Sequence, residues 1–188
     1  MDVGHFIDEL KRGRGQAFSE IVKRYQRPLY QFLSTWNLNH EQKQDILQDI
    51  FMKVYTHINS FDSQKASFST WVFTLAKYQA INLAQTRRTR EEKHSELHAN
   101  WEEAHEMKCP LEEKEQRECL RRALAQLPEE FKNVVILSFF NELSLQEIAE
   151  IENLPLGTVK SRIFRGKDLL KKLMSSNESE EGGDHGKN

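Results

Sequence analysis

Basic side chains at helical spacing near the carboxyl end of the sequence are the residues best suited to bind a polyanion. Residues 155–174 are rich in Lys and Arg and contain a single acidic residue, Asp168. Lys and Arg neutralise phosphates, while Arg and Ser side chains hydrogen-bond the edges of bases. DNA binding is therefore predicted here, with an ordinary basic surface helix as the alternative. The residues expected to carry it are Thr158, Lys160, Ser161, Arg162, Phe164 and Arg165.

The elements that must position this helix are predicted from the residues before it. Ser144 and Glu147 have the spacing of a capping box, which predicts the start of a short helix. Pro155 ends that helix because it disfavours helical geometry in the residue before it. A short helix, a tight turn and a basic second helix predict a helix-turn-helix that lays its second helix in the major groove of DNA.

A second group of side chains lies on one face of an earlier helix, predicted at about residues 41–58. The apolar residues of this helix share one stripe. The opposite face carries Asp45, Gln48, Asp49 and Met52. Their position opposite the apolar stripe predicts an interface with another molecule rather than a core. A polar connection at residues 59–67 and another helix at about residues 68–88 are expected to follow.

The composition indicates a helical and polar protein. Of its 188 residues, 38% are hydrophobic and 30% are charged, which is more polar than one compact core of this size usually is. The predicted fold class is all-α, with two small helical domains joined by a flexible acidic linker. The expected segments are an N-terminal tail at 1–15, a first domain at 16–90, the acidic linker at 91–110, a second domain at 111–174 and a disordered acidic tail at 175–188.

Several classes of protein are disfavoured by what the sequence lacks. No stretch approaches the ~20 apolar residues of a membrane span, no signal peptide is evident, and the two cysteines make no disulfide framework, so a cytoplasmic protein is predicted. No phosphate-binding Gly loop or nucleophile motif is found, so neither an enzyme nor a cofactor is expected. The alternative of a zinc site in the linker has loose spacing, and solvated side chains are favoured there instead. Its candidate ligands are His94, His98, His105 and Cys109.

Five runs of residues resemble the extracytoplasmic-function (ECF) group of bacterial RNA polymerase sigma factors. The runs are Asp45–Phe51, Phe61 with Phe68–Trp71, Leu127–Phe131, Leu143–Ala149 and Pro155–Arg162. The resemblance extends over about residues 16–174 and implies a dissociable, non-enzymatic subunit that directs promoter-specific transcription initiation. It implies core RNA polymerase, through its clamp and flap, and promoter DNA as partners. The alternative function is an autonomous helix-turn-helix transcriptional regulator, which would bind DNA without the polymerase.

The resemblance also implies a role for each domain. The first would be a sigma region 2-like bundle that binds the polymerase clamp and opens the −10 element, and the second a region 4-like helix-turn-helix that binds the −35 element. The clamp residues implied are Asp45, Gln48, Asp49 and Met52. The −10 residues implied are Asn59, Ser60, Phe61, Lys65, Trp71 and Lys77. Phe61 offers either a stacking surface for an unstacked base or a plug for the core, and both interpretations stay open.

The sequence departs from the family directly before Asp45. Acidic residues are usual there, and Gln42, Lys43 and Gln44 stand in their place. Lys43 is expected to weaken binding to a basic polymerase surface, unless the change is neutral at a tolerant interface. One hypothesis is that a Ser/Thr kinase restores the negative charge by phosphorylation, and an anti-sigma factor is the other expected regulator. The candidate phosphate acceptors are Thr56, Ser60 and Ser63.

Overall fold

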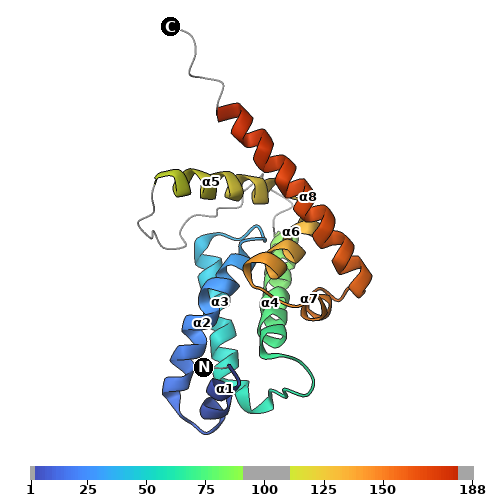
Figure 1. Ribbon diagram of the computed structural model, residues 1–188. Helices are drawn as coiled ribbons and strands as arrows, with labels where there is room; N and C mark the ends of the chain where they lie inside the picture. Colours follow the sequence, from blue (N-terminus) through green and yellow to red (C-terminus); the bar gives the residue numbers. More distant parts are fainter. Residues whose placement is uncertain (1–2, 91–110, 182–188) are drawn as a thin grey trace.

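The computed structural model describes the backbone of residues 3–90 and 111–181 and the side chains of residues 3–86 and 119–175. Within these ranges every regular element is a helix (Figure 1), which confirms the all-α prediction. None of the described helices is long and apolar enough to cross a membrane. No described group of three or more His, Cys, Asp or Glu residues is placed to hold a metal ion. The linker predicted at residues 91–110, with its candidate zinc ligands, lies outside the described residues.

Four helices and one 3₁₀ turn form the first body of the molecule. They are α1 (Val3–Lys11), α2 (Gly15–Leu33), α3 (His40–His57), η1 (Ile58–Ser60) and α4 (Phe68–Arg90). Their inward faces meet in an apolar core in which Phe32, Ile50 and Phe73 are almost fully buried. The Asn39 side chain accepts from the Gln42 backbone N–H, and the Gln42 side chain accepts from the Asn39 backbone N–H. This capping box fixes where α3 begins.

The N-terminal tail predicted at residues 1–15 is wrong, because most of this segment is α1. Ile7 and Leu10 are at most 6% exposed and belong to the core, and α1 packs against α2. Lys11 donates a 2.8 Å hydrogen bond to the backbone carbonyl of Phe61, in the connection after η1. The apolar stripe of α1 is too short to predict a helix by itself, since short helices depend on tertiary packing.

The second body is built around the longest helix, α8. Its elements are α5 (Leu111–Gln126), α6 (Glu129–Val135), the π-helical turn η2 (Ile136–Phe140), α7 (Leu145–Glu152) and α8 (Leu156–Glu181). Both α5 and α6 pack against α8 (Figure 1). Leu124, Leu127, Val135 and Ile136 form a small core between them.

The disordered tail predicted at residues 175–188 is wrong for its first part, because α8 continues to Glu181. No Gly or Pro interrupts the chain between Met174 and Gly182, and Glu favours the helix. Residues 182–188 lie outside the described residues.

The two bodies are in direct contact. α7 packs along α4, and η2 contacts α2; Figure 1 shows α7 beside α4. Val72 and Ala76 of α4 and Ile148 and Ile151 of α7 belong to one buried apolar cluster. The short helix α7 is therefore held by both the first body and α8.

Candidate nucleic-acid and polymerase interfaces

α7 and α8 have the geometry predicted for a helix-turn-helix. At the start of α7, the Glu147 backbone N–H donates to the Ser144 hydroxyl (3.3 Å), and the Ser144 backbone N–H donates to the Glu147 carboxylate (2.8 Å). Asn153 ends α7 in the left-handed conformation, with φ 53°, which Asn tolerates better than most residues. The Leu154 N–H then donates to the Ala149 carbonyl (3.0 Å), which closes the turn into α8.

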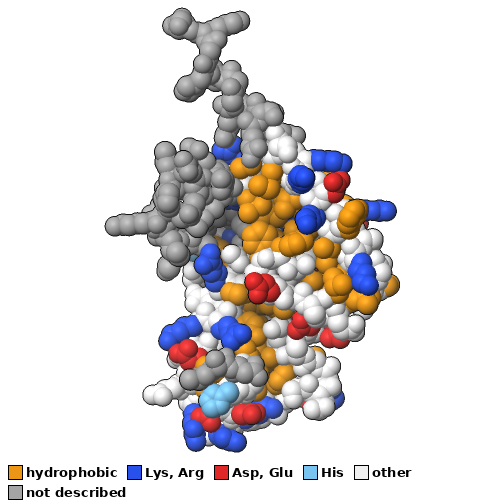
Figure 2. Space-filling model, viewed as in Figure 1, with side chains coloured by type: hydrophobic (Ala, Val, Ile, Leu, Met, Phe, Trp, Pro, Cys, Tyr) orange, Lys and Arg blue, Asp and Glu red, His pale blue; other side chains and the backbone are white. Residues whose placement is uncertain are grey.

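One face of α8 is exposed and basic. Lys160, Ser161 and Arg165 are exposed, and Phe164 is 77% exposed although it is apolar. Val159 is fully buried. Figure 2 shows Lys and Arg side chains over the α8 side of the molecule. Aromatic and Arg side chains are typical of interfaces, so this face is suited to a partner surface rather than to the core.

Two of the residues predicted to bind DNA are less accessible than the others. Arg162 is half-buried, and its guanidinium lies 3.4 Å from the Glu130 carboxylate of α6. Thr158 is also half-buried, and its backbone carbonyl accepts a 2.9 Å hydrogen bond from the Ser161 hydroxyl. Arg162 therefore helps to hold α8 against α6, and DNA contact by either residue stays a prediction.

Gly166 determines how closely α6 and α8 approach, although it was not among the residues predicted from the sequence. A Cβ at this position would lie 2.6 Å from Val135 Cγ2 and 3.2 Å from Phe131 Cβ. Any larger side chain must push α6 away from α8, because neither neighbour is the flexible end of a long side chain. The available signal was an isolated Gly inside a helical pattern, which is typical of a packing constraint.

The residues predicted to bind the −10 element lie on the connection after α3 and on α4. Asn59, Ser60 and Lys65 are exposed, and the Lys65 ammonium lies 3.9 Å from the Asp62 carboxylate. They form an accessible polar surface. Their contact with DNA stays a prediction.

Phe61 is a core residue, so the predicted base-stacking role is corrected. Its side chain is 7% exposed, and its ring centroid lies 5.4 Å from that of Phe68 and 5.3 Å from that of Trp71. The ring is held by these neighbours and by the Lys11 contact to its backbone carbonyl. Of the two interpretations of Phe61, the structure supports the core plug, while the neighbouring Trp71 is partly exposed.

Lys77 of α4 points at the second body instead of the solvent. Its ammonium donates to the backbone carbonyl of Ile151 (3.0 Å) and lies 3.1 Å from the Glu152 carboxylate, both on α7. The Lys77 side chain is 16% exposed. In this arrangement Lys77 is not available to a phosphate.

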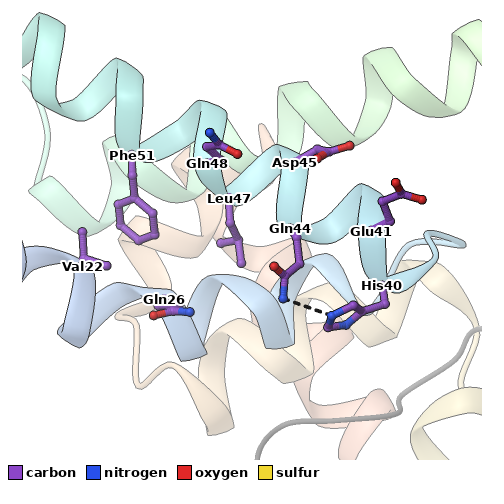
Figure 3. A pocket seen from close by; sticks show the side chains of 9 residues that line it. All are labelled: Val22, Gln26, His40, Glu41, Gln44, Asp45, Leu47, Gln48 and Phe51. Atoms are coloured by element: carbon purple, nitrogen blue, oxygen red, sulfur yellow. Dashed lines mark hydrogen bonds between the residues drawn. The ribbon is translucent and has the colours of Figure 1, made fainter.

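A groove of about 460 Å³ lies between α2 and α3. In Figure 3 the apolar side chains of Val22, Leu47 and Phe51 lie in the space between the two helices. Asp45 and Gln48, two of the predicted polymerase contacts, also line the groove. Apolar side chains flanked by polar ones suit the binding of a helix from a partner.

The other two predicted polymerase contacts lie further along α3. Asp49 is exposed, and Met52 is 56% exposed. All four predicted contacts therefore lie on the accessible side of α3, although only two of them line the groove.

Residues 21–90 match the family model Sigma-70 region 2, and residues 117–170 match Sigma-70, region 4. The ECF RNA polymerase sigma factor SigW of Bacillus subtilis is 30% identical over 179 residues, which cover 89% of this chain and 94% of that protein. This chain belongs to the family of ECF RNA polymerase sigma factors. Sigma factors are transcription initiation factors rather than catalysts. Region 2 of this chain is residues 21–90, and region 4 is residues 117–170.

One further relative agrees with this assignment, and one solved structure shares the fold. The ECF RNA polymerase sigma-E factor of Escherichia coli K12 is 31% identical over 174 residues, covering 87% of this chain and 90% of that protein. A similar fold is found in the sigma factor RpoE of Bartonella quintana, solved in complex with the anti-sigma factor NepR. That structure has a TM-score of 0.66 and 20% identity, and the match covers 86% of this chain and 98% of that one.

Lys43 does not lie on the exposed face of region 2, so the structure gives no direct contact through which it would weaken polymerase binding. It is 1% exposed, with its ammonium 4.6 Å from the centroid of the Tyr30 ring and 3.4 Å from the Ser34 hydroxyl. Burial lowers the pKa of Lys43. The spacing of Lys43 from Leu47 and Ile50 is that of one helix face, and this spacing could have predicted the burial.

The other two departures from the family have separate roles. Gln42 is used in the Asn39 capping box. Gln44 is exposed and lines the groove, where its amide lies 3.0 Å from the His40 imidazole. Only Gln44 of the three substitutions therefore changes the charge of the groove.

The candidate phosphate acceptors are accessible. Thr56, Ser60 and Ser63 are all exposed. The Thr56 hydroxyl donates to the Met52 backbone carbonyl (2.8 Å), and the Ser60 hydroxyl donates to the His57 carbonyl (2.7 Å). Neither contact buries the oxygen that a kinase would modify.

Proposed function

We propose that this sigma factor binds core RNA polymerase in the cytoplasm and directs it to promoters. Region 2 binds the polymerase clamp through the exposed face of α3, and it opens the −10 element through α4 and the connection before it. Region 4 binds the −35 element through α8, beside the polymerase flap. Each contact is weak alone, but joining the two regions in one chain raises the effective concentration of the second once the first is bound.

The exposed face of α8 is the observation that carries this proposal. Lys160 and Arg165 supply charge for phosphates and, in the case of Arg165, a planar donor for the edge of a guanine. Phe164 supplies an apolar surface, and a thymine methyl in the major groove is the matching group on DNA. The turn between α7 and α8 presents these side chains together on one helix face.

Run-off transcription tests the proposal directly. Purified core polymerase on a library of bacterial promoter fragments is expected to give specific transcripts only when this protein is added. Arg165→Ala is expected to reduce these transcripts strongly. Lys23→Ala is the matched control, because Lys23 is an exposed cation on α2 that pairs with Glu20 (2.8 Å). Tight binding to a duplex without polymerase, together with no transcripts, would support the autonomous regulator instead.

We further propose that phosphorylation near the end of α3 strengthens polymerase binding. Thr56 follows Asp45, Asp49 and Met52 at helical spacing, so all four share the exposed face of α3. A phosphate there adds about −1.5 to −2 charges to that face. Because Thr56 lies in the last turn of α3, negative charge opposes the helix dipole, and any gain in affinity must come from the partner.

The phosphorylation proposal is tested with charge-mimicking variants. Thr56→Glu, Ser60→Glu and Ser63→Glu are compared with wild type for affinity to core polymerase, measured by fluorescence anisotropy. Ser175→Glu is the control, because it adds the same charge at an exposed site on α8. The proposal fails if none of the three variants near α3 tightens binding more than the control does.

An anti-sigma factor is proposed as a second regulatory partner. The support is that the similar sigma factor of Bartonella quintana was solved in complex with one. Affinity purification of this protein from its own cells is expected to recover a protein that blocks run-off transcription. Recovery of polymerase subunits alone would argue against such a partner.

A further inference from the structure

The connection between η1 and α4, residues 61–67, is held at both ends by side chains of other helices. At its start, the Lys11 ammonium of α1 donates a 2.8 Å hydrogen bond to the Phe61 carbonyl. The same ammonium lies 5.5 Å from the centroid of the Phe61 ring. Just after its end, the Tyr25 hydroxyl of α2 lies 3.0 Å from the Ser69 hydroxyl in the first turn of α4. The chain therefore enters and leaves the connection at fixed points.

Between these points the connection presents a short polar tip. Its exposed residues are Asp62, Ser63, Gln64 and Lys65. The Gln64 backbone N–H donates to the Asp62 carboxylate (2.9 Å), and the Lys65 backbone N–H donates to the Asp62 carbonyl (3.1 Å). These two bonds keep the tip compact, but both lie within it. The position of the tip relative to the rest of the molecule is therefore set by the two ends of the connection.

Lys11 fixes the first of these ends. No backbone N–H of the described residues donates to the Phe61 carbonyl, so the Lys11 ammonium is the donor that the structure gives it. The helix that carries Lys11 is itself anchored, because Ile7 and Leu10 are buried in the core and α1 packs against α2 and η1. Figure 1 shows α1 at the same end of the first body as the connection. Through Lys11, the core therefore holds the backbone at Phe61.

We propose that Lys11 is a positioning residue for recognition of the −10 element. The inference rests on the proposed function, because it needs the connection to contact −10 DNA. Phe61 lies between three of the predicted −10 contacts, which are Asn59, Ser60 and Lys65. A fixed Phe61 backbone sets where they lie relative to α4. A connection already held in its binding conformation loses less conformational entropy when it binds a displaced base. Lys11 acts through Phe61 rather than on the DNA, and it favours the correct −10 base over a wrong one.

Lys11→Met tests the proposal, because it removes the ammonium and keeps an unbranched side chain. Arg12→Met is the matched control: it removes the same charge from the next residue, whose guanidinium lies 3.4 Å from the Glu9 carboxylate. Run-off transcription by the holoenzyme compares a promoter selected with wild type against single-base variants of its −10 and −35 elements. Lys11→Met is expected to reduce discrimination at the −10 element about fivefold relative to the control, as the loss of one hydrogen bond predicts.

Discrimination at the −35 element is expected to stay unchanged in Lys11→Met. A ratio of transcripts from two promoters does not depend on how much of the protein is folded, so a loss of stability alone leaves both ratios as they are. Lys11→Arg, whose guanidinium can still donate to the Phe61 carbonyl, is expected to keep wild-type discrimination at both elements.

Hydrogen exchange of the free protein is the second measurement, and it needs no polymerase. The Phe61 backbone N–H, which donates to the Ile58 carbonyl (3.1 Å), is expected to exchange about fivefold faster in Lys11→Met than in Arg12→Met, because the start of the connection opens more often. The backbone N–H groups of α3 are expected to exchange at the same rate in both variants.

Three outcomes would overturn the proposal. The first is equal −10 discrimination by Lys11→Met and Arg12→Met, and the second is an equal loss at the −10 and −35 elements. The third is unchanged exchange of the Phe61 N–H in Lys11→Met. Failure of the proposed function would instead appear as an absence of run-off transcripts from wild type, whatever the exchange rates of the free chain.

Discussion

Lysines inside the molecule and lysines on the outer face of α8 have opposite roles: the first are buried in the fold, and the second are exposed to a partner. Lys43 and Lys132 are 1% and 6% exposed, and burial lowers the pKa of each, partly offset at Lys132 by Glu129. Lys132 donates to the Ala125 carbonyl near the end of α5 (3.0 Å). Lys160, by contrast, is exposed on α8. Position relative to the apolar stripe, rather than charge alone, separates cations that stabilise the fold from cations that can bind DNA.

The largest effect is expected at Lys43. Lys43→Glu places a carboxylate in the core beside the Tyr30 ring, and a buried charge without a matched partner costs about 3–5 kcal/mol of unfolding free energy. Lys43→Met, which keeps the volume, is expected to be neutral or stabilising. Urea unfolding of both variants measures the difference. A Lys43→Glu protein as stable as wild type would contradict the burial of this lysine.

Gly166 tests the contact that holds the basic face in place. Gly166→Val is expected to cost about 1–3 kcal/mol, because the added side chain overlaps Val135 and Phe131. Gly157→Ala is the control, since a Cβ there meets no atom within 4 Å, and it is expected to stabilise α8 by up to about 1 kcal/mol. Thermal unfolding compares them. Equal stability of the two variants would show that α6 and α8 do not approach so closely.

The outer face of α8 is expected to respond to substitution in binding rather than in folding. Lys160→Ala is expected to lower promoter affinity of the holoenzyme and to reduce the slope of log affinity against log salt by about 1. Phe164→Ala is expected to leave the unfolding free energy within about 0.5 kcal/mol of wild type, because its ring is 77% exposed. Filter binding at several salt concentrations measures the slope. An unchanged slope for Lys160→Ala would mean that this lysine contacts no phosphate.

The smallest effect is expected in how the free energy of unfolding changes as the pH falls. Burial raises the pKa of Glu147, but hydrogen bonds from Ser67 and Ser144 outweigh it and hold this pKa below its ordinary value. The unfolded chain therefore binds this proton more readily than the folded chain. The contribution of Glu147 to stability is fully present above the unfolded pKa of about 4.3 and is lost as the pH falls through the lower folded value. The stability difference between wild type and Glu147→Gln should narrow between about pH 5 and pH 3; a constant difference would contradict this.

Much of the helical architecture could be predicted from local patterns. The capping box of Ser144 and Glu147 and the stop at Pro155 lie within a few residues of one another, so the start of α7 and the turn into α8 needed no tertiary information. The exposure of Phe164 followed from its position away from the stripe that contains Val159. The all-α class followed from the same periodic patterns.

The structural features that could not be predicted depend on contacts between segments that are distant in the sequence. α1 is held by packing on α2 and by the Lys11 contact to residue 61. The burial of Phe61 depends on the packing of Phe68 and Trp71 against its ring. The pairing of Lys77 with Glu152 joins two regions separated by a long stretch of chain, and no local spacing points to it. Lys43 differs from these cases, since its place on the apolar stripe was visible and its charge was given too much weight.

Permanganate footprinting of a promoter selected by run-off transcription tests the central claim most directly, because it detects unpaired thymines where the −10 element has opened. Core polymerase together with this protein is expected to make thymines of the −10 element reactive, while either component alone leaves the duplex intact. Arg165→Ala should reduce this reactivity in proportion to the loss of promoter binding. A promoter that stays fully paired in the presence of both components, while this protein alone protects the duplex, would contradict the account.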